Sequence, residues 1–187
     1  GKQRGAASTK FSEHQVFAQW FPDRSQSRQL HPFCNNANAA IRRSLWEKHP
    51  YDEYLTGLED LEWARWAMQE LDMQRILILD WDLHHGNGTQ HSFYDSDKVL
   101  YLSSHQYPYY PGTGAFPEIG KGKGEGFTFN VPLGGGEGDM EFARIVNELA
   151  VPVARAYRPE LILISCGFDI HDGDPLGAMR VTPAGTA

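Results

Sequence analysis

Two unbroken apolar runs, each followed directly by polar residues, constrain the fold of this 187-residue chain most strongly. Residues 75–80 read Arg-Ile-Leu-Ile-Leu-Asp, and residues 161–165 read Leu-Ile-Leu-Ile-Ser. A strand with one face in water alternates apolar and polar residues, so runs of this kind are typical of strands buried on both faces, as in a parallel sheet. We expect two further strands, at residues 99–103 and 127–131.

Helical patterns separate these strands. Apolar residues recur at three- and four-residue spacing between residues 58 and 71, which predicts an amphipathic helix. A second helical pattern spans residues 140–157, and Pro152 within it predicts a kink or an interruption. Strands that alternate with helices predict an α/β domain with a largely parallel sheet over residues 57–187. Residues 1–56 are poorly patterned by comparison.

Composition limits the partners and the compartment. The net charge of −7 provides no general attraction to nucleic acid, and no apolar run approaches the roughly 18 residues that a membrane span needs. Cys34 and Cys166 lie far apart in the sequence, which suits a reducing compartment with Cys166 as a buried apolar residue. We find no signal peptide and expect a cytoplasmic protein, with a nuclear location and any oligomeric state left open.

Two of the predicted strands run directly into polar clusters, DWDLHHGNG after the first run and CGFDIHDGD after residue 165. Ligands bind at the carboxyl ends of the strands in sheets of this class. The two-residue period of a strand places Asp80, Asp82 and His84 on one side, where two carboxylates and an imidazole need a cation. Asp169 follows its own strand at a distance that completes a three-ligand site.

Oxygen and nitrogen ligands without thiolate, with a fourth position open, are typical of a catalytic zinc ion, although iron or cobalt accepts the same ligands. We expect Gly86 and Gly88 to let the chain turn tightly beneath this site.

The segment DWDLHHGNGT at residues 80–89 is similar to the metal-binding signature of zinc-dependent histone deacetylases and their bacterial relatives, the acetylpolyamine amidohydrolases and the acetoin-utilisation proteins. The likeness covers about residues 60–187 and continues in order through VLYLSSH, YYPGTG, NVPL and GFDIHDGDPLG. The resemblance implies an arginase/deacetylase-like parallel sheet with flanking helices, as an incomplete version of the family domain.

Carried over position by position, the resemblance implies one zinc ion per chain on Asp82, His84 and Asp169. It also implies a structural monovalent cation, potassium, held by Asp80, the carbonyls of Asp82 and His84, and the Ser103 hydroxyl.

The same resemblance implies a substrate channel lined by Tyr110 and Gly112, which admits an acyl-lysine side chain. The implied reaction is metal-assisted hydrolysis of the acyl amide of a lysine in a protein or peptide, or of an acetylpolyamine. The zinc polarises the carbonyl and activates water, a base takes the proton, and a hydrogen-bond donor stabilises the oxyanion.

The sequence departs from the family in two places. The family has a Gly-His-His dyad before the metal strand, whereas this sequence has only isolated histidines there, at His14, His31 and His49. His31 is the candidate base by default. The segment of the family's oxyanion-stabilising tyrosine does not occur within these 187 residues. We therefore expect metal binding with slow turnover or none.

Three interpretations stay open at this point. The first is a deacetylase. The second is a catalytically impaired fragment, or a metal-binding or interaction module with a relict deacetylase core. The third is an arginase-like hydrolase, which the aromatic channel motif and the single Asp-x-His argue against, because arginases build a two-metal cluster.

Overall fold

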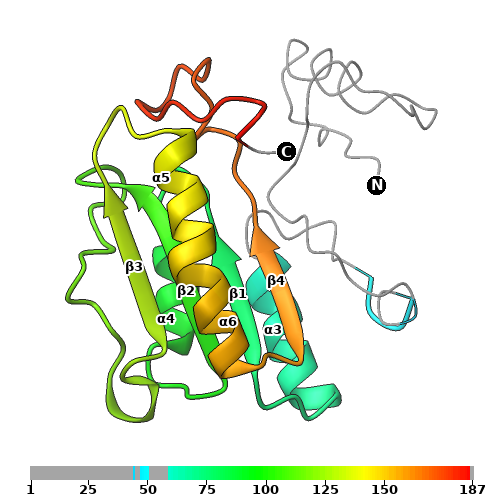
Figure 1. Cartoon of the computed structure of the whole chain (residues 1–187). Coiled ribbons are helices and arrows are strands. Elements are labelled where there is room, and N and C mark those ends of the chain that lie inside the picture. The colour runs from blue at the N-terminus through cyan, green and yellow to red at the C-terminus, as the bar shows by residue number, and fades with distance from the viewer. Residues whose placement is uncertain (1–43, 45–46, 51–58, 186–187) are drawn as a thin grey trace, which may run out of the picture. The chain divides into compact units, whose positions relative to one another are not determined.

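The computed structural model describes residue 44, residues 47–50 and residues 59–185, and most of the segment 1–56, with His31 in it, lies outside this range. Figure 1 shows the elements in chain order. They are α3 (Glu59–Glu70), β1 (Ile76–Asp80), α4 (Asn87–Phe93), β2 (Val99–Gln106), the short 3₁₀ turn η1 (Gly122–Gly124), β3 (Thr128–Leu133), α5 (Asp139–Arg144), the π-helical segment η2 (Ile145–Ala150), α6 (Val151–Tyr157) and β4 (Leu161–Ser165).

The four strands form one parallel sheet in the order β3-β2-β1-β4, as the alternation of apolar runs and helices predicts. Three of the four strands differ from their expected bounds by one to three residues at an end, and β4 has the bounds expected. β1 pairs with both β2 and β4, so its last residue, Asp80, lies opposite Ser103 on one side and Ser165 on the other. The polar segments that follow β1 and β4 therefore begin next to each other.

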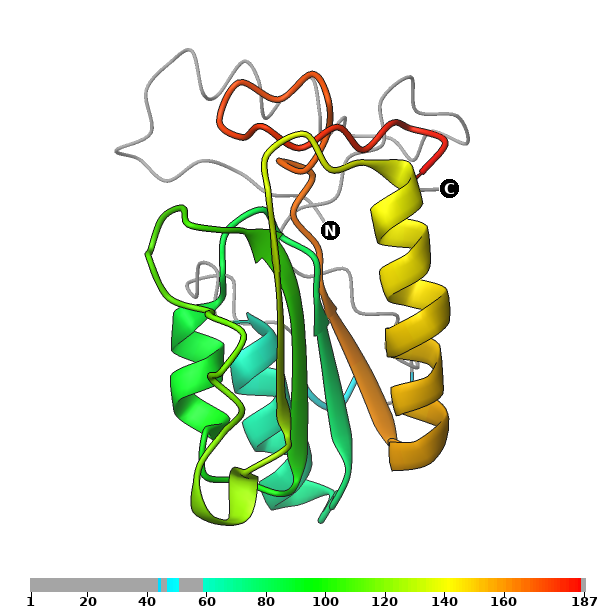
Figure 2. The same cartoon turned by 60° about the vertical axis from the view of Figure 1, so that its left-hand side comes forward.

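Helices cover both faces of the sheet, with α3 and α4 on one face and the continuous α5–η2–α6 helix on the other (Figure 2). Alternate residues of β1 pack against the helices on opposite faces of the sheet. Ile76 and Ile78 pack with buried residues of α3 and α4, whereas Leu77 and Leu79 pack with the layer that contains Ala150 and Val153. Because both faces are covered, the strand needs apolar residues at consecutive positions, as its sequence shows.

The expected interruption near Pro152 takes the form of a π-helical segment. α5 and α6 are regular α-helices, and the six residues Ile145–Ala150 between them are π-helical. Pro152 lies in the first turn of α6, where the α-helical pattern starts again. A proline has no N–H to donate to the preceding turn, so a change of hydrogen-bond register just before it avoids an unsatisfied carbonyl.

The expectation of a tight turn after the metal strand holds at Gly86, where the N–H of Asn87 donates to the His85 carbonyl at 2.9 Å around it, and is wrong for Gly88. Gly88 lies inside the helix α4, and Gly86 precedes that helix with a φ of −76°, which any residue adopts. Gly86 is needed for space, because an added Cβ would lie 2.6 Å from both Asp80 Oδ2 and the Tyr101 hydroxyl oxygen. A close approach of side chains, rather than a special backbone angle, therefore explains the glycine.

Within the described residues, no helix combines the length and the apolar character needed to cross a bilayer.

Candidate metal centre

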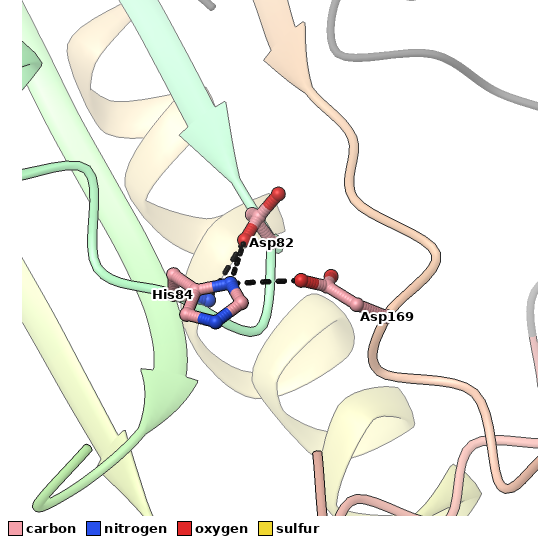
Figure 3. A group of neighbouring side chains, drawn as sticks. All are labelled: Asp82, His84 and Asp169. Carbon is pink, nitrogen blue, oxygen red and sulfur yellow. Dashed lines mark hydrogen bonds and ion pairs between the residues drawn. The ribbon is translucent and has the colours of Figure 1, made fainter. Parts of the chain in front are cut away.

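The structure brings Asp82, His84 and Asp169 together at the carboxyl end of the sheet (Figure 3). Asp82 and His84 come from the segment that follows β1, and Asp169 comes from the segment that follows β4. One possible ligand atom from each side chain lies within 4.8 Å of the other two. Two segments more than 80 residues apart in the sequence therefore contribute to one group, because β1 and β4 are neighbours in the sheet.

The His84 Nδ1 atom lies between the two carboxylates. It is 2.8 Å from Asp169 Oδ2 and 3.2 Å from Asp82 Oδ1. The three side chains are 16–30% exposed, so they are reachable from solvent without being freely solvated. Two carboxylates and an imidazole that converge in a half-buried position form a donor set suited to a divalent ion of the zinc class.

Backbone N–H groups hold the two carboxylates in place. The N–H of His84 donates to Asp82 Oδ1 at 2.7 Å, and the N–H of Leu83 donates to Asp169 Oδ1 at 3.0 Å. Leu83 itself is fully buried and packs in the core beneath the group, so its main chain is well anchored. The carboxylates are therefore oriented by the same short segment that supplies His84.

Gly167 makes the approach of the two carboxylates possible. A Cβ added at this position would lie 2.2 Å from Asp82 Oδ2 and 2.5 Å from Asp169 Oδ1, and both distances are shorter than real Cβ contacts. Sequence reasoning missed this role, because it depends on contacts across the two strand ends. The only local signal in the sequence is that Gly167 directly follows the buried Cys166 and lies two residues before Asp169.

Asp80 lies behind the group and does not join it. It is buried, its carboxylate accepts a hydrogen bond from the Tyr101 hydroxyl at 2.8 Å, and it also accepts the N–H of Asp82 at 3.1 Å. Ser103, the register partner of Asp80 on β2, is fully buried as well. Asp80, Asp82 and His84 were expected on one side of an extended segment. Only Asp82 and His84 reach the metal group, because the strand β1 ends at Asp80.

Two tyrosines stand beside His84. The ring centroid of Tyr109 lies 5.8 Å from that of His84, and the ring centroid of Tyr110 lies 6.1 Å away. Tyr110 is 76% exposed, so core packing does not explain it, and the Tyr109 hydroxyl donates to the carbonyl of Leu176. Gly112 adopts a φ of 86° and donates its N–H to the Tyr109 carbonyl, so it shapes the turn that carries both rings.

Two other described histidines, His85 and His105, have ring partners outside the metal group. Both ring nitrogens of His85 contact the side chains of Thr113 and Gln90, and burial lowers the pKa of His85. Burial also lowers the pKa of His105 to about 4, and its ring contacts Ser103 and the carbonyl of Gly114.

His49, one of the three upstream histidines, pairs with Glu62 and stacks on Trp66. The geometry thus gives it no role at the metal group, whereas His14 and His31 lie outside the described residues.

Comparison with known proteins identifies the family. The model of the histone deacetylase domain matches residues 63–187, which is more than half of the sequence. The chain belongs to the histone deacetylase family. Relatives of this chain include a probable deacetylase of Archaeoglobus fulgidus, 41% identical over 88% of this chain and 46% of the relative. Another is the chloroplastic histone deacetylase 14 of Arabidopsis thaliana, 46% identical over 65% of this chain and 29% of the relative.

Solved structures of the family agree with the fold. The structure of the histone deacetylase Clr3 matches with a TM-score of 0.63 and 43% identity, covering 65% of this chain and 22% of the other. The HDA15 HD domain matches with a TM-score of 0.61 and 46% identity, covering 63% of this chain and 34% of the other. The chain thus spans less than half the length of each of these four relatives. The family is typically zinc-dependent, and Asp82, His84 and Asp169 fit that ion by donor type and convergence.

The protonation of Asp82 predicts how metal affinity depends on pH. Burial, together with the neighbouring charge of Asp169, raises the pKa of the Asp82 carboxyl to about 6, although the hydrogen bonds from His84 oppose this shift. A metal ion needs the ionised carboxylate, so below about pH 6 it must displace a proton. We expect the zinc affinity of this chain to fall about fivefold from pH 6 to pH 5 through this carboxyl, and about tenfold for each further pH unit below that.

Equilibrium dialysis at pH 5, 6, 7 and 8 measures this dependence. Equal affinities at pH 5 and pH 6 would show that Asp82 is already ionised at pH 5 or does not bind the metal.

Proposed function

We propose that this chain holds one zinc ion on Asp82, His84 and Asp169, as the metal centre of a hydrolase that removes acetyl or acyl groups from lysine side chains or from polyamines. The observation that carries the proposal is the convergence of two carboxylates and an imidazole nitrogen within 4.8 Å, from two loops of one parallel sheet. The donor set contains no thiolate and is partly exposed, which is typical of a catalytic rather than a structural zinc site.

The roles of the protein groups follow from their contacts. When bound, zinc polarises an amide carbonyl and lowers the pKa of a coordinated water. Asp82 and Asp169 supply negative charge to hold the ion, and the N–H groups of His84 and Leu83 fix the direction of their carboxylates. His84 contributes the nitrogen that lies between them.

Tyr109 and Tyr110 provide the contact surface for the substrate. Their ring centroids lie 5.8 and 6.1 Å from that of His84, and an aliphatic stem packs well against aromatic faces. The exposure of Tyr110 leaves this surface free for a ligand. Gly112 belongs to the same turn, where its N–H donates to the Tyr109 carbonyl. Acyl-lysine in a protein or peptide and an acylated polyamine both offer such a stem.

A structural potassium ion behind the zinc is part of the proposal. Asp80 and Ser103 lie side by side in the β1–β2 register, both buried, next to the segment with the carbonyls of Asp82 and His84. The Nε2 of His105 lies 2.9 Å from the Gly114 carbonyl, which accepts only, so this nitrogen carries the proton and Nδ1 accepts from the Ser103 hydroxyl. The lone pairs of Ser103 Oγ therefore remain available to a hard cation.

A metal-binding chain with impaired turnover is the second candidate. It is supported by the engagement of His85 and His105 in contacts that leave neither of them beside the metal group as a base. Each positioned acid or base is worth roughly 10²–10⁴-fold in rate, so a site without one turns over slowly. An arginase-like hydrolase has less support, since the described residues contain one ligand cluster and the identities of 41–46% are to deacetylases.

Metal analysis and hydrolysis by the same sample test the proposal. We expect about one zinc per chain after dialysis, together with metal-dependent release of acetate from an acetyl-lysine peptide or an acetylpolyamine, at a rate well below about 1 s⁻¹. Two metals per chain would favour the arginase-like alternative. Stoichiometric zinc with no release of acetate would favour the impaired chain, and a rate of about 1 s⁻¹ or more would show that a base is present, with His31→Ala as the next variant to examine.

A further inference from the structure

A network of polar side chains lies between α4 and the segment of residues 107–119, which we call the tyrosine loop because it carries Tyr109 and Tyr110. The proposed reaction uses none of these side chains. The network consists of the side chains of His85, Gln90, His105, Glu118 and Asn130, of which all but Glu118 are buried. Buried polar groups that are connected in this way specify one arrangement of the chain, because any other arrangement leaves them unsatisfied.

Glu118 joins the two sides of the network. Its Oε1 accepts the N–H groups of Gly114 at 3.1 Å and Ala115 at 2.8 Å, which closes the tyrosine loop on itself. Its Oε2 accepts the amide of Gln90 at 2.6 Å, and Gln90 belongs to α4. Burial opposes the ionisation of Glu118, but these hydrogen bonds outweigh it and lower the pKa, so the group is a carboxylate at neutral pH.

The carboxylate of Glu118 determines which way each proton points. A carboxylate only accepts, so the Gln90 nitrogen must face it and Gln90 Oε1 must face the other way, toward His85 Nε2 at 3.0 Å and Asn130 Nδ2 at 2.7 Å. Asn130 Nδ2 also lies 3.1 Å from the Glu118 carbonyl, which requires the same orientation of the Asn130 amide. His85 Nε2 therefore carries the proton, and its Nδ1 accepts from the Thr113 hydroxyl at 2.7 Å.

The tyrosine loop packs tightly against the same two histidines. Gly114 adopts a φ of 87°, and an added Cβ would lie 2.3 Å from His105 Nε2 and 2.7 Å from His85 Cδ2. His105 Nε2 donates to the Gly114 carbonyl at 2.9 Å. The tyrosine loop therefore packs against His85, which directly follows His84 in the sequence. Only one position of the loop satisfies these contacts.

We propose that Glu118 is a positioning residue for ligand binding: it ties the tyrosine loop to α4 through Gln90, and so holds Tyr109 and Tyr110 beside His84. The proposal deepens the proposed function and rests on it, since the two tyrosines are the surface offered to the acyl-lysine ligand. The metal ligands are held by other N–H groups, those of Leu83 and His84. Loss of the Glu118 link should therefore affect the ligand and leave the metal affinity unchanged.

Three variants of the full chain test this role. Glu118→Gln keeps an oxygen for Gly114 and Ala115 but presents an amide nitrogen to Gln90, so Gln90 must rotate and His85 must move its proton to Nδ1. Adding Gln90→Glu restores an acceptor opposite the new amide, with the total charge unchanged, and returns the proton to Nε2. Glu125→Gln, in the exposed part of the segment that follows, is the matched control for loss of one carboxylate.

Three measurements on each variant read out the effect: the protonated nitrogen of His85 by ¹⁵N NMR, the zinc dissociation constant, and the dissociation constant of an acetyl-lysine peptide. For Glu118→Gln we expect His85 Nε2 to change from protonated to unprotonated, peptide affinity to fall about tenfold or more, and zinc affinity to stay within about threefold. The double variant should recover both the tautomer and the peptide affinity.

The results separate this inference from the proposed function. A parallel loss of zinc affinity, or an unchanged His85 tautomer with unchanged peptide affinity, overturns the positioning role. If the parent chain binds neither the acetyl-lysine peptide nor an acetylpolyamine, the proposed function fails, and the ¹³C and ¹H shifts of the Tyr109 and Tyr110 rings then decide about Glu118. Shifts that move in Glu118→Gln and return in the double variant support the role, and shifts that do not move overturn it.

Discussion

Replacement of Asp169 by alanine is expected to lower the zinc affinity of this chain at least about 100-fold and to remove any metal-dependent hydrolysis. Even a residue that only contacts a metal ligand costs about 10–100-fold in affinity when it is changed, so the loss of a ligand should cost more. Asp169 supplies a carboxylate 2.8 Å from His84 Nδ1 and also accepts the N–H of Leu83. Its removal deletes a negative charge and leaves that N–H without its acceptor.

Asp169→Asn separates the two effects. The asparagine keeps the size of the side chain and an oxygen for Leu83, but it lacks the charge, so zinc affinity should fall nearly as far while the melting temperature changes little. Asp172→Asn is the control, because this carboxylate lies in the same loop, is exposed, and pairs with His171 instead. Competition against a chelator of known affinity gives the dissociation constants. Zinc affinity in Asp169→Ala within threefold of the parent would remove Asp169 from the site.

Gly167→Ala should disrupt the same centre without changing a ligand. The new methyl group overlaps both Asp82 Oδ2 and Asp169 Oδ1, at 2.2 and 2.5 Å, so at least one carboxylate must turn away. We expect zinc affinity to fall about 10–100-fold, as for a lost supporting contact, and the free energy of unfolding to fall by about 1–3 kcal/mol from overpacking.

Gly173→Ala is the matched control, since its Cβ would come no closer than 3.7 Å to a neighbouring atom, His171 Nδ1. It should bind zinc as the parent does and unfold at nearly the same temperature. Calorimetry for zinc binding and thermal unfolding by circular dichroism measure the two effects. Full zinc affinity in Gly167→Ala would mean that the two carboxylates do not need to approach each other for binding.

Much of the fold was predictable because its signals are local. The unbroken apolar run Leu-Ile-Leu-Ile predicts the strand β4 without tertiary information. Burial on both faces holds for β1 but not for β4, the last strand of the described sheet, where Ile162 is 43% exposed. The spacing of apolar residues in α3 likewise needs no tertiary information. The helix α4 was missed, because seven residues with two of its first three positions Asn and Gly carry no apolar periodicity. It forms because Phe93 packs under the sheet and Gln90 bonds across to the tyrosine loop.

The sequence by itself determined the parallel α/β class and the candidate ligands, since Asp82, His84 and Asp169 all directly follow apolar strands, where side chains of such sheets meet a ligand. Only the tertiary structure decided that β1 and β4 are adjacent, which turns two separate clusters into one group. It also decided the roles of Gly167, Glu118 and His85. Their contacts join residues from different elements, and the close approach of two chain segments leaves no periodic or compositional trace in either one.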